Sequence, residues 1–106
     1  MGEHTIVLNS TNFDKETSKG EWVVDFFAEW CGPCKISSPQ FDAAAQALKG
    51  KVKFGKVDVD SQQELAERFE VMSIPSFVFI KNGEMIDKIV GAVSKDSIVD
   101  RASEAF

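Results

Sequence analysis

The segment at residues 22–28, WVVDFFA, constrains the fold more than any other part of the sequence. Its side chains are apolar at both odd and even positions, with the exception of Asp25. Because neighbouring side chains of a strand point to opposite faces, a strand of this composition is covered on both faces. We therefore expect a central strand of an α/β sheet with helices on either side.

Strand-like and helix-like segments alternate along the rest of the chain. Further strands are expected at 6–8, 52–59, 77–80 and 85–90, and helices at 12–18, at 33–49, and from Ser61 and Ser94 onward. Ser61 opens a capping-box pattern, and Asn82-Gly83 supplies a hairpin turn between the last two strands. The order β-α-β-α-β-α-β-β-α predicts an α/β fold with a mixed sheet of about five strands and about four flanking helices. Strands separated by helices are expected to pair in parallel, and the hairpin to add an antiparallel ribbon.

Length and charge exclude several classes of protein. A chain of 106 residues has the length of one domain, so we expect residues 1–106 to form a single one. Its 12 Lys and Arg against 17 Asp and Glu give a net charge of −5, which disfavours binding to nucleic acid or to an anionic membrane. No apolar run approaches the ~18 residues that span a bilayer, and no signal-peptide pattern is present at the start. We therefore expect a cytoplasmic protein.

The two cysteines of the chain lie in the segment WCGPCK, residues 30–35, where the central strand meets the long helix. A helix N-terminus favours a thiolate, so Cys31 is the predicted nucleophile. Cys34 lies one helical turn further on the same face, close enough for a disulfide with Cys31, and is expected to be the more buried of the two. Such a pair is equipped for dithiol–disulfide exchange, in which Cys34 resolves the mixed disulfide.

Two other interpretations of the cysteine pair remain open at this point. A zinc site needs four ligands, and the chain offers only these cysteines and the distant His4, so two chains would have to share their pairs. A purely structural pair would have no reason to flank Gly32-Pro33 at a strand-to-helix junction. We therefore favour redox exchange over both and expect no metal.

Asp25 and Pro75 stand out on physical grounds as well. A charged and unpaired carboxylate in so apolar a strand would cost several kcal/mol, so Asp25 is expected to be paired or protonated. The alternative for Asp25 is a solvent-facing position on an edge strand. Pro75 precedes the apolar strand at 77–80, and the beginning of a strand is a position that tolerates proline.

The sequence around the cysteines resembles the thioredoxin family, and the likeness covers essentially the whole chain. The longest match is VVDFFAEWCGPCK at 23–35; the others, in family order, are Phe13-Asp14, Pro39, Lys56-Val57-Asp58, VMSIP at 71–75, KNGE at 81–84 and Val90-Gly91-Ala92. The chain departs from the family at Phe27, Ser73 and Ser76, none of which removes a chemical group from the site. The resemblance implies a thioredoxin fold and a monomeric protein-disulfide reductase. Disulfide-containing proteins would be its substrates, a thioredoxin reductase would reduce it again, and no bound cofactor is needed.

The resemblance also implies roles for individual residues. Asp25 would be a buried acid that accepts a proton from Cys34, and Lys56 on the neighbouring strand would be its counter-charge. The peptide bond before Pro75 would be cis and would present backbone to an extended substrate. An apolar rim would surround Cys31, formed by Trp30, Ile74, Pro75, Val90, Gly91 and Ala92.

Two other activities are compatible with these residues. A disulfide oxidase or isomerase of the same fold would use the same cysteines, but its members more often carry His where this chain has Pro33 in the active-site dipeptide Gly32-Pro33. A non-catalytic module would use the apolar rim to bind a partner, and it would keep working with both cysteines replaced.

Overall fold

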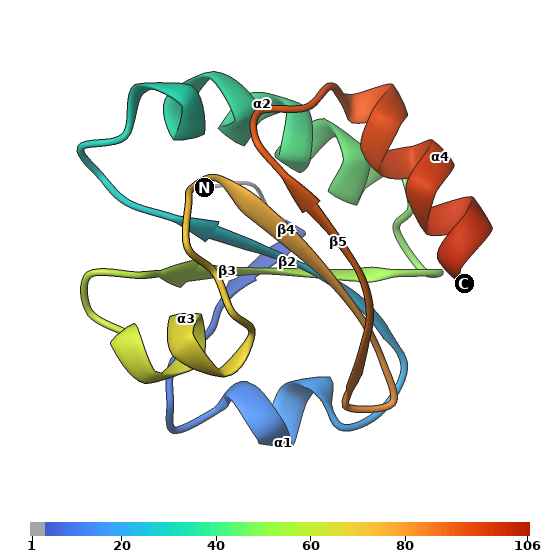
Figure 1. The fold of residues 1–106 in the computed structure, drawn as a ribbon. Helices are drawn as coiled ribbons and strands as arrows, with labels where there is room; N and C mark the ends of the chain where they lie inside the picture. The colour runs from blue at the N-terminus through green and yellow to red at the C-terminus, as the bar shows by residue number, and fades with distance from the viewer. Residues whose placement is uncertain (1–3) are drawn as a thin grey trace.

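Five strands form one mixed sheet in the computed structural model, which describes residues 4–106 (Figure 1). The strands are β1 (Thr5–Val7), β2 (Glu21–Phe27), β3 (Lys53–Asp58), β4 (Ser76–Lys81) and β5 (Glu84–Val90). They lie in the order β1-β3-β2-β4-β5, so β2 is the middle strand, as its apolar sequence predicts. The edge-strand alternative for Asp25 is therefore wrong.

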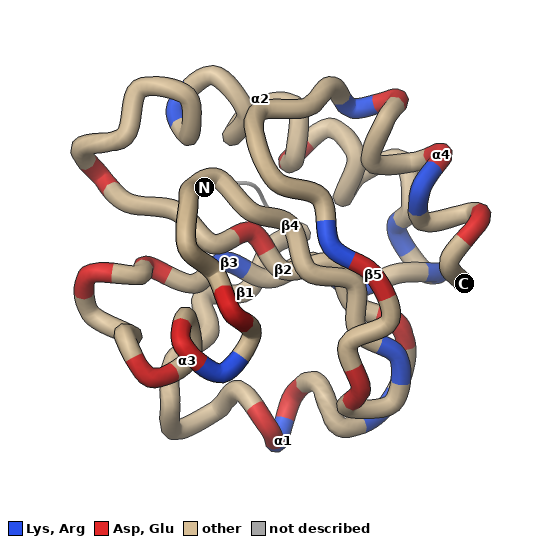
Figure 2. The backbone as a smooth tube through the Cα atoms, in the orientation of Figure 1, with Lys and Arg blue, Asp and Glu red and all other residues tan. Residues whose placement is uncertain are grey.

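Helices cover both faces of the sheet (Figure 1). They are α1 (Phe13–Thr17), α2 (Gly32–Ala47), α3 (Gln63–Arg68) and α4 (Lys95–Ala105). The helices α1 and α3 lie on one face, and α2 and α4 on the other. Within residues 4–106, none of the helices is long and apolar enough to cross a membrane. Figure 2 shows Lys and Arg dispersed among Asp and Glu along the chain and not gathered in one basic region.

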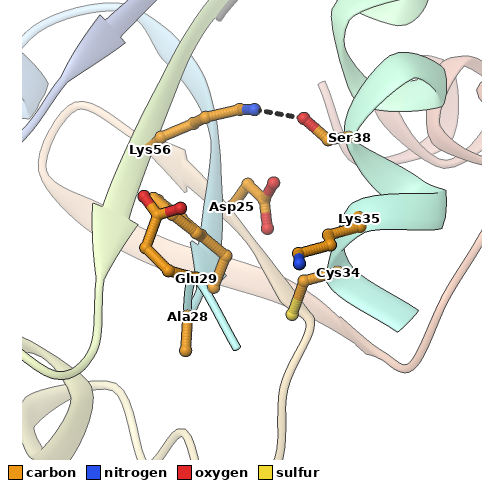
Figure 3. Close-up of a pocket in the computed structure, with 8 residues that line it drawn as sticks. Asp25, Ala28, Glu29, Cys34, Lys35, Ser38 and Lys56 are labelled. Carbon is orange, nitrogen blue, oxygen red and sulfur yellow. Dashed lines mark hydrogen bonds between the residues drawn. The ribbon is translucent and has the colours of Figure 1, made fainter. Parts of the chain in front are cut away.

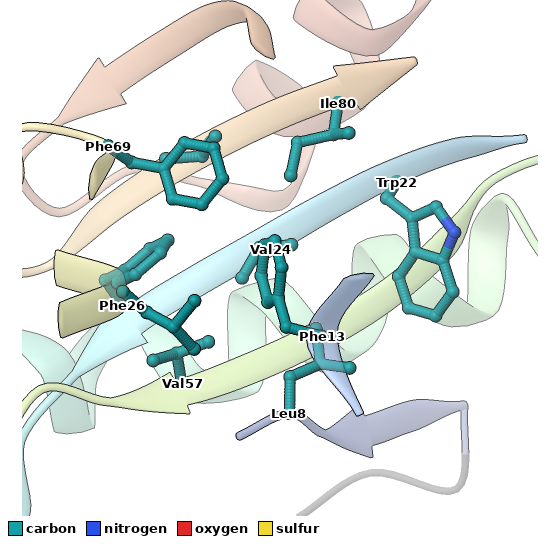
Figure 4. Packing of buried hydrophobic residues seen from close by; sticks show 10 residues of the cluster. Leu8, Phe13, Trp22, Val24, Phe26, Val57, Phe69 and Ile80 are labelled. Carbon is teal, nitrogen blue, oxygen red and sulfur yellow. The ribbon is translucent and has the colours of Figure 1, made fainter. Parts of the chain in front are cut away.

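Alternate side chains of β2 enter two separate cores. Trp22, Val24 and Phe26 pack toward α1 and α3, in the cluster of buried residues shown in Figure 4. Val23 belongs to the second cluster, which includes Phe41 of α2. Asp25 has the same parity as Val23, so the alternation directs its side chain toward α2, the helix that begins at the cysteines.

The predicted direction of one strand is wrong. The strands β1, β3 and β2 are parallel, but β4 runs antiparallel to β2 although α3 separates it from β3. The helix α3 has 6 residues, or about 9 Å, and cannot carry the chain back along a strand of about 20 Å. The chain therefore enters β4 near the C-terminal ends of β2 and β3. This places Ile74-Pro75 beside the start of α2.

The two predicted serine caps have different outcomes. Ser94 precedes α4, and its hydroxyl accepts a hydrogen bond from the N–H of Ser97, as predicted. The capping box at Ser61 is wrong, because α3 begins after Gln62, whose side chain makes no capping bond. The Ser61 hydroxyl instead donates to the carbonyl of Asp58, within the turn that follows β3. A serine near a helix start has several backbone partners within reach, and this turn provides a nearer one.

Gly55 on β3 offers a test of how closely the sheet packs. A Cβ atom at this position would collide with the side chain of Leu8, which is itself 1% exposed. We expect Gly55→Ala to lower the free energy of unfolding by about 1–3 kcal/mol, measured by urea denaturation. The control is Gly32→Ala at the start of α2, where a Cβ would meet no atom within 4 Å and no loss is expected. Equal stability of Gly55→Ala and the parent protein would contradict this packing.

Candidate active site

The start of α2 brings the two cysteines together. Cys31 is the N-cap residue, with extended backbone, and Cys34 lies in the first turn. The two are joined by a disulfide, with their Cα atoms 5.2 Å apart. The N–H of Cys34 points at the Cys31 Sγ, 3.2 Å away. Pro33 occupies the first turn, where the missing N–H of proline costs no hydrogen bond.

The expected difference in burial between the cysteines is absent. Cys31 is 4% exposed and Cys34 is 5% exposed, so Cys34 is not the more buried residue. Both pack with Ala28, and Phe27 and Ile74 lie against the same cluster. The disulfide holds the two sulfur atoms together beneath these side chains. The two cysteines therefore differ in their positions relative to the start of α2 and not in their burial.

The loops before β4 and after β5 meet next to the disulfide. The Ile74 carbonyl oxygen lies 4.0 Å from the Cys31 Sγ, and the Ile74–Pro75 peptide bond is cis. The Gly91 N–H donates to the Pro75 carbonyl oxygen at 2.8 Å, which ties the second loop to the first. Gly91 has φ +103°, a conformation that favours glycine. These contacts place the 90–92 segment beside Pro75.

The predicted rim residues differ in how much they expose. Trp30 is 70% exposed and Val90 58%, whereas Pro75 is buried and contributes through its backbone. Ala92 is exposed, and Ile74 and Gly91 are half-buried. The indole N–H of Trp30 donates to the Asp60 carboxylate at 2.9 Å, which holds the ring at one side of the site. The part played by Asp60 was not predicted from the sequence.

Two exposed apolar side chains near the site were also missed. Ile36 is 72% exposed and follows Cys34 by two residues, and Met72 is 95% exposed and precedes Ile74 by two residues. The available signal was their position in the sequence, since both are apolar residues that flank the segments 31–34 and 74–75. Helical periodicity does not place Ile36 on the inner face of α2.

Asp25 and Cys34 both line a pocket of about 210 Å³ (Figure 3). Asp25 is 2% exposed, and its Oδ1 atom has no hydrogen-bond partner. Burial raises the pKa of Asp25 from 3.8 to about 7; the positive charge of Lys56 lowers it, and the negative charge of Asp42 raises it. The carboxyl group is thus largely protonated below neutral pH and ionised above it.

Lys56 lowers the Asp25 pKa as a counter-charge would, but its side chain makes its hydrogen bond elsewhere. The two residues are neighbours across the β2–β3 ladder, and both side chains point toward α2. The Lys56 Nζ instead donates to the Ser38 Oγ at 2.6 Å and lies 3.8 Å from Asp42 Oδ1. Lys56 therefore acts on Asp25 through space, without a direct bond.

Ser38 and Asp42 are site residues that were not predicted from the sequence. They follow Cys34 at i+4 and i+8, so all three lie along one face of α2. This spacing was the available signal, since Cys34 was already expected to be buried. Among the residues that the structure describes, no group of three or more His, Cys, Asp and Glu could hold a metal ion.

Comparison with known proteins agrees with this geometry. The sequence model of the family described as Thioredoxin matches residues 4–104. The chain is 40% identical over 95 residues to "Thioredoxin" of Staphylococcus haemolyticus, covering 90% of this chain and 91% of that protein. It is 37% identical to "Thioredoxin" of Staphylococcus aureus over the same shares. The chain belongs to the thioredoxin family. Together with the Cys31–Cys34 disulfide at the start of α2, these matches identify the chain as a protein-disulfide reductase.

The pKa of Asp25 predicts how the stability of this thioredoxin-family chain depends on pH. The folded state keeps a proton that the unfolded state releases near pH 3.8, so stability falls as the pH rises toward 7 and the loss is complete above it. We expect Asp25→Asn to remove this loss. Its gain in unfolding free energy over the parent should be about 3 kcal/mol larger at pH 8.5 than at pH 4.

Urea denaturation of the disulfide form at the two pH values measures this difference. Asp100→Asn is the matched control, because it makes the same substitution at an exposed position on α4. A gain for Asp25→Asn that is the same at both pH values would contradict a raised pKa for Asp25.

Proposed function

We propose that this chain reduces protein disulfides in two thiol–disulfide exchange steps. The Cys31 thiolate attacks one sulfur of the substrate disulfide, forming a mixed disulfide and releasing the first substrate thiol. The Cys34 thiolate then attacks the Cys31 sulfur, forming the Cys31–Cys34 disulfide and releasing the second substrate thiol. Two electrons pass from the cysteine pair to the substrate. The observation that carries this proposal is the disulfide between residues one turn apart at the start of α2.

Cys31 is the attacking residue in this scheme because of its position at the helix start. As N-cap, its sulfur accepts the Cys34 N–H, one of the N–H groups that the helix itself leaves unpaired. The partial positive charge at the N-terminus of the 16-residue helix α2 stabilises a thiolate there. Cys34 lies inside the first turn and is the resolving residue.

Asp25 is the proton acceptor for Cys34 in the second step. The two side chains line the same pocket, whose volume of about 210 Å³ is several times the ~30 Å³ share of one water molecule. With a pKa of about 7, the carboxyl group both accepts and returns a proton near neutral pH. We route the proton of Cys34 to Asp25 through this pocket, and Lys56 tunes the charge at its inner end.

The substrate lies across the loops that surround Cys31. The Ile74 carbonyl, 4.0 Å from the Cys31 Sγ, supplies backbone for pairing with an extended substrate chain. Trp30, Val90 and Ala92 offer apolar contacts beside it, and the absence of a side chain at Gly91 permits close approach. Gly32-Pro33 keeps the cysteines one turn apart.

The partners follow from this chemistry. Disulfide-containing proteins are the substrates, and a thioredoxin reductase restores the dithiol, so the chain needs no bound cofactor. We place the reaction in the cytoplasm, where thiols are kept reduced. We also propose that residues 1–106 work as one monomeric domain. A net charge of −5 supports a partner set without nucleic acid.

Reduction of insulin disulfides in the presence of dithiothreitol tests the scheme. Cys31→Ser should abolish the acceleration of insulin reduction over the rate with dithiothreitol alone, because it removes the nucleophile of the first step. When the reduced Cys34→Ser variant is mixed with insulin after removal of dithiothreitol, it should accumulate a stable mixed disulfide with the substrate, because the second step is missing. Mass spectrometry after acid quenching detects that adduct.

The double variant Cys31→Ser/Cys34→Ser is the control for substrate binding without chemistry. Insulin reduction by Cys31→Ser at the parent rate, or a mixed disulfide that forms through Cys34 in that variant, would contradict the assigned roles. If the double variant kept working as the parent protein does, the chain would be a partner-binding module and not a disulfide reductase.

A further inference from the structure

Lys56 is a buried cation that is held by α2. Its side chain is 7% exposed, and its Nζ donates to the Ser38 Oγ at 2.6 Å. Its other polar contact is the Asp42 Oδ1 at 3.8 Å, an ion pair longer than a hydrogen bond. The rings of Phe27 and Phe41 each lie 5.8 Å from the Nζ and flank the ammonium group. The cation is thus fixed by contacts that do not include Asp25.

The Oδ1 atom of Asp25 lacks a hydrogen-bond partner, although Asp25 neighbours this cation across the β2–β3 ladder. The β2–β3 register makes Asp25 and Lys56 direct neighbours, yet Asp25 Oδ1 is buried and unbonded. Figure 3 shows the Lys56 side chain extending past Asp25 to reach Ser38. A buried ammonium group beside a free carboxylate oxygen would ordinarily bond to it, because burial strengthens the attraction. Another interaction must therefore keep the two apart.

That interaction comes from two residues one turn apart on α2. Ser38 and Asp42 are related by i and i+4, so both reach the same point above β3. We propose that Ser38 and Asp42 are positioning residues that hold the Lys56 ammonium group away from Asp25. The pair acts on Asp25 through Lys56, and neither residue takes part in the exchange of disulfides.

Every charged group near Asp25 enters this balance. Lys56 comes from β3, Asp42 and Lys35 from α2, and Glu29 from the connection between β2 and α2. Lys35 and Glu29 are exposed, so water screens their charges. On the other side β4 places apolar Phe77 opposite Asp25. The position of the Lys56 charge is therefore the main electrostatic variable at this carboxyl group.

The consequence for the reaction rests on the proposed role of Asp25. A direct ion pair would stabilise the carboxylate and make it a weaker base toward the Cys34 thiol. With the cation held by Ser38, the carboxyl group keeps a pKa near neutrality and remains able to take up a proton. The hold on Lys56 thus preserves the basicity that the second step needs.

Removal of the Ser38 hydroxyl provides the test. In Ser38→Ala the Lys56 ammonium group loses its hydrogen-bond acceptor, and Asp25 Oδ1 on the neighbouring strand is a buried oxygen without a partner. We expect the titration midpoint of Asp25 to fall by about one pH unit, since a direct opposite charge lowers a carboxyl pKa by one or more. Ser38→Ala/Asp42→Asn should lower it further, both because the second contact to Lys56 is removed and because the negative charge of Asp42, which raises the Asp25 pKa, is lost. NMR of the Asp25 side-chain carbonyl carbon in the disulfide form measures the midpoint, with Asp25→Asn identifying the resonance.

Two controls separate positioning from a general change in packing. Ser38→Thr keeps a hydroxyl group and should keep the parent midpoint. In a Lys56→Met background, Ser38→Ala should leave the Asp25 midpoint unchanged, because the cation that it releases is absent. An unchanged midpoint in Ser38→Ala, or a fall of the same size with and without Lys56, would overturn the proposal. Because the titration uses no substrate, its result is independent of whether Asp25 accepts the proton of Cys34.

Discussion

The burial of the Asp25 carboxyl group is the interaction on which the account of this site depends. The side chain loses its water because β2 is the middle strand and helices cover both of its faces. Loss of hydration is the largest cause of its raised pKa, and the opposing effect of Lys56 does not cancel it. An acid that would otherwise be ionised at every physiological pH therefore changes its charge near neutrality, in a pocket that Cys34 also lines, as its proposed role as proton acceptor requires.

The site lies at the end of the sheet where β2 and β3 finish and β4 begins. The chain leaves β2 to enter α2 at the cysteines, and it leaves β3 to enter the short helix α3. Because α3 does not return the chain across the sheet, β4 begins at this end, and Ile74-Pro75 lies against Cys31. The backbone that we propose to face the substrate and the sulfur that we propose to react are thus neighbours as a consequence of topology.

Features set by local sequence could be predicted, and features set by contacts between elements could not. The CGPC spacing fixes the disulfide within one turn, and Asn82-Gly83, with φ of 50° and 86°, forms the predicted hairpin turn. The direction of β4 depends on how far α3 reaches, which a pattern of apolar residues does not reveal. The hydrogen-bond partner of Lys56 depends on which side chains of α2 lie above β3. The family resemblance implied only that Lys56 is the counter-charge of Asp25, and the structure shows that its hydrogen bond goes to Ser38.

The most direct test of the account is the pH dependence of the second exchange step. Rapid mixing measures how fast Cys34 displaces a chromogenic thiol from Cys31, between about pH 5 and pH 9, in the parent protein and in Asp25→Asn. The account predicts that the parent rate rises through the Asp25 pKa of about 7 and that Asp25→Asn lacks this rise and is slower above it. Identical pH profiles for the two proteins would show that Asp25 does not take the proton of Cys34.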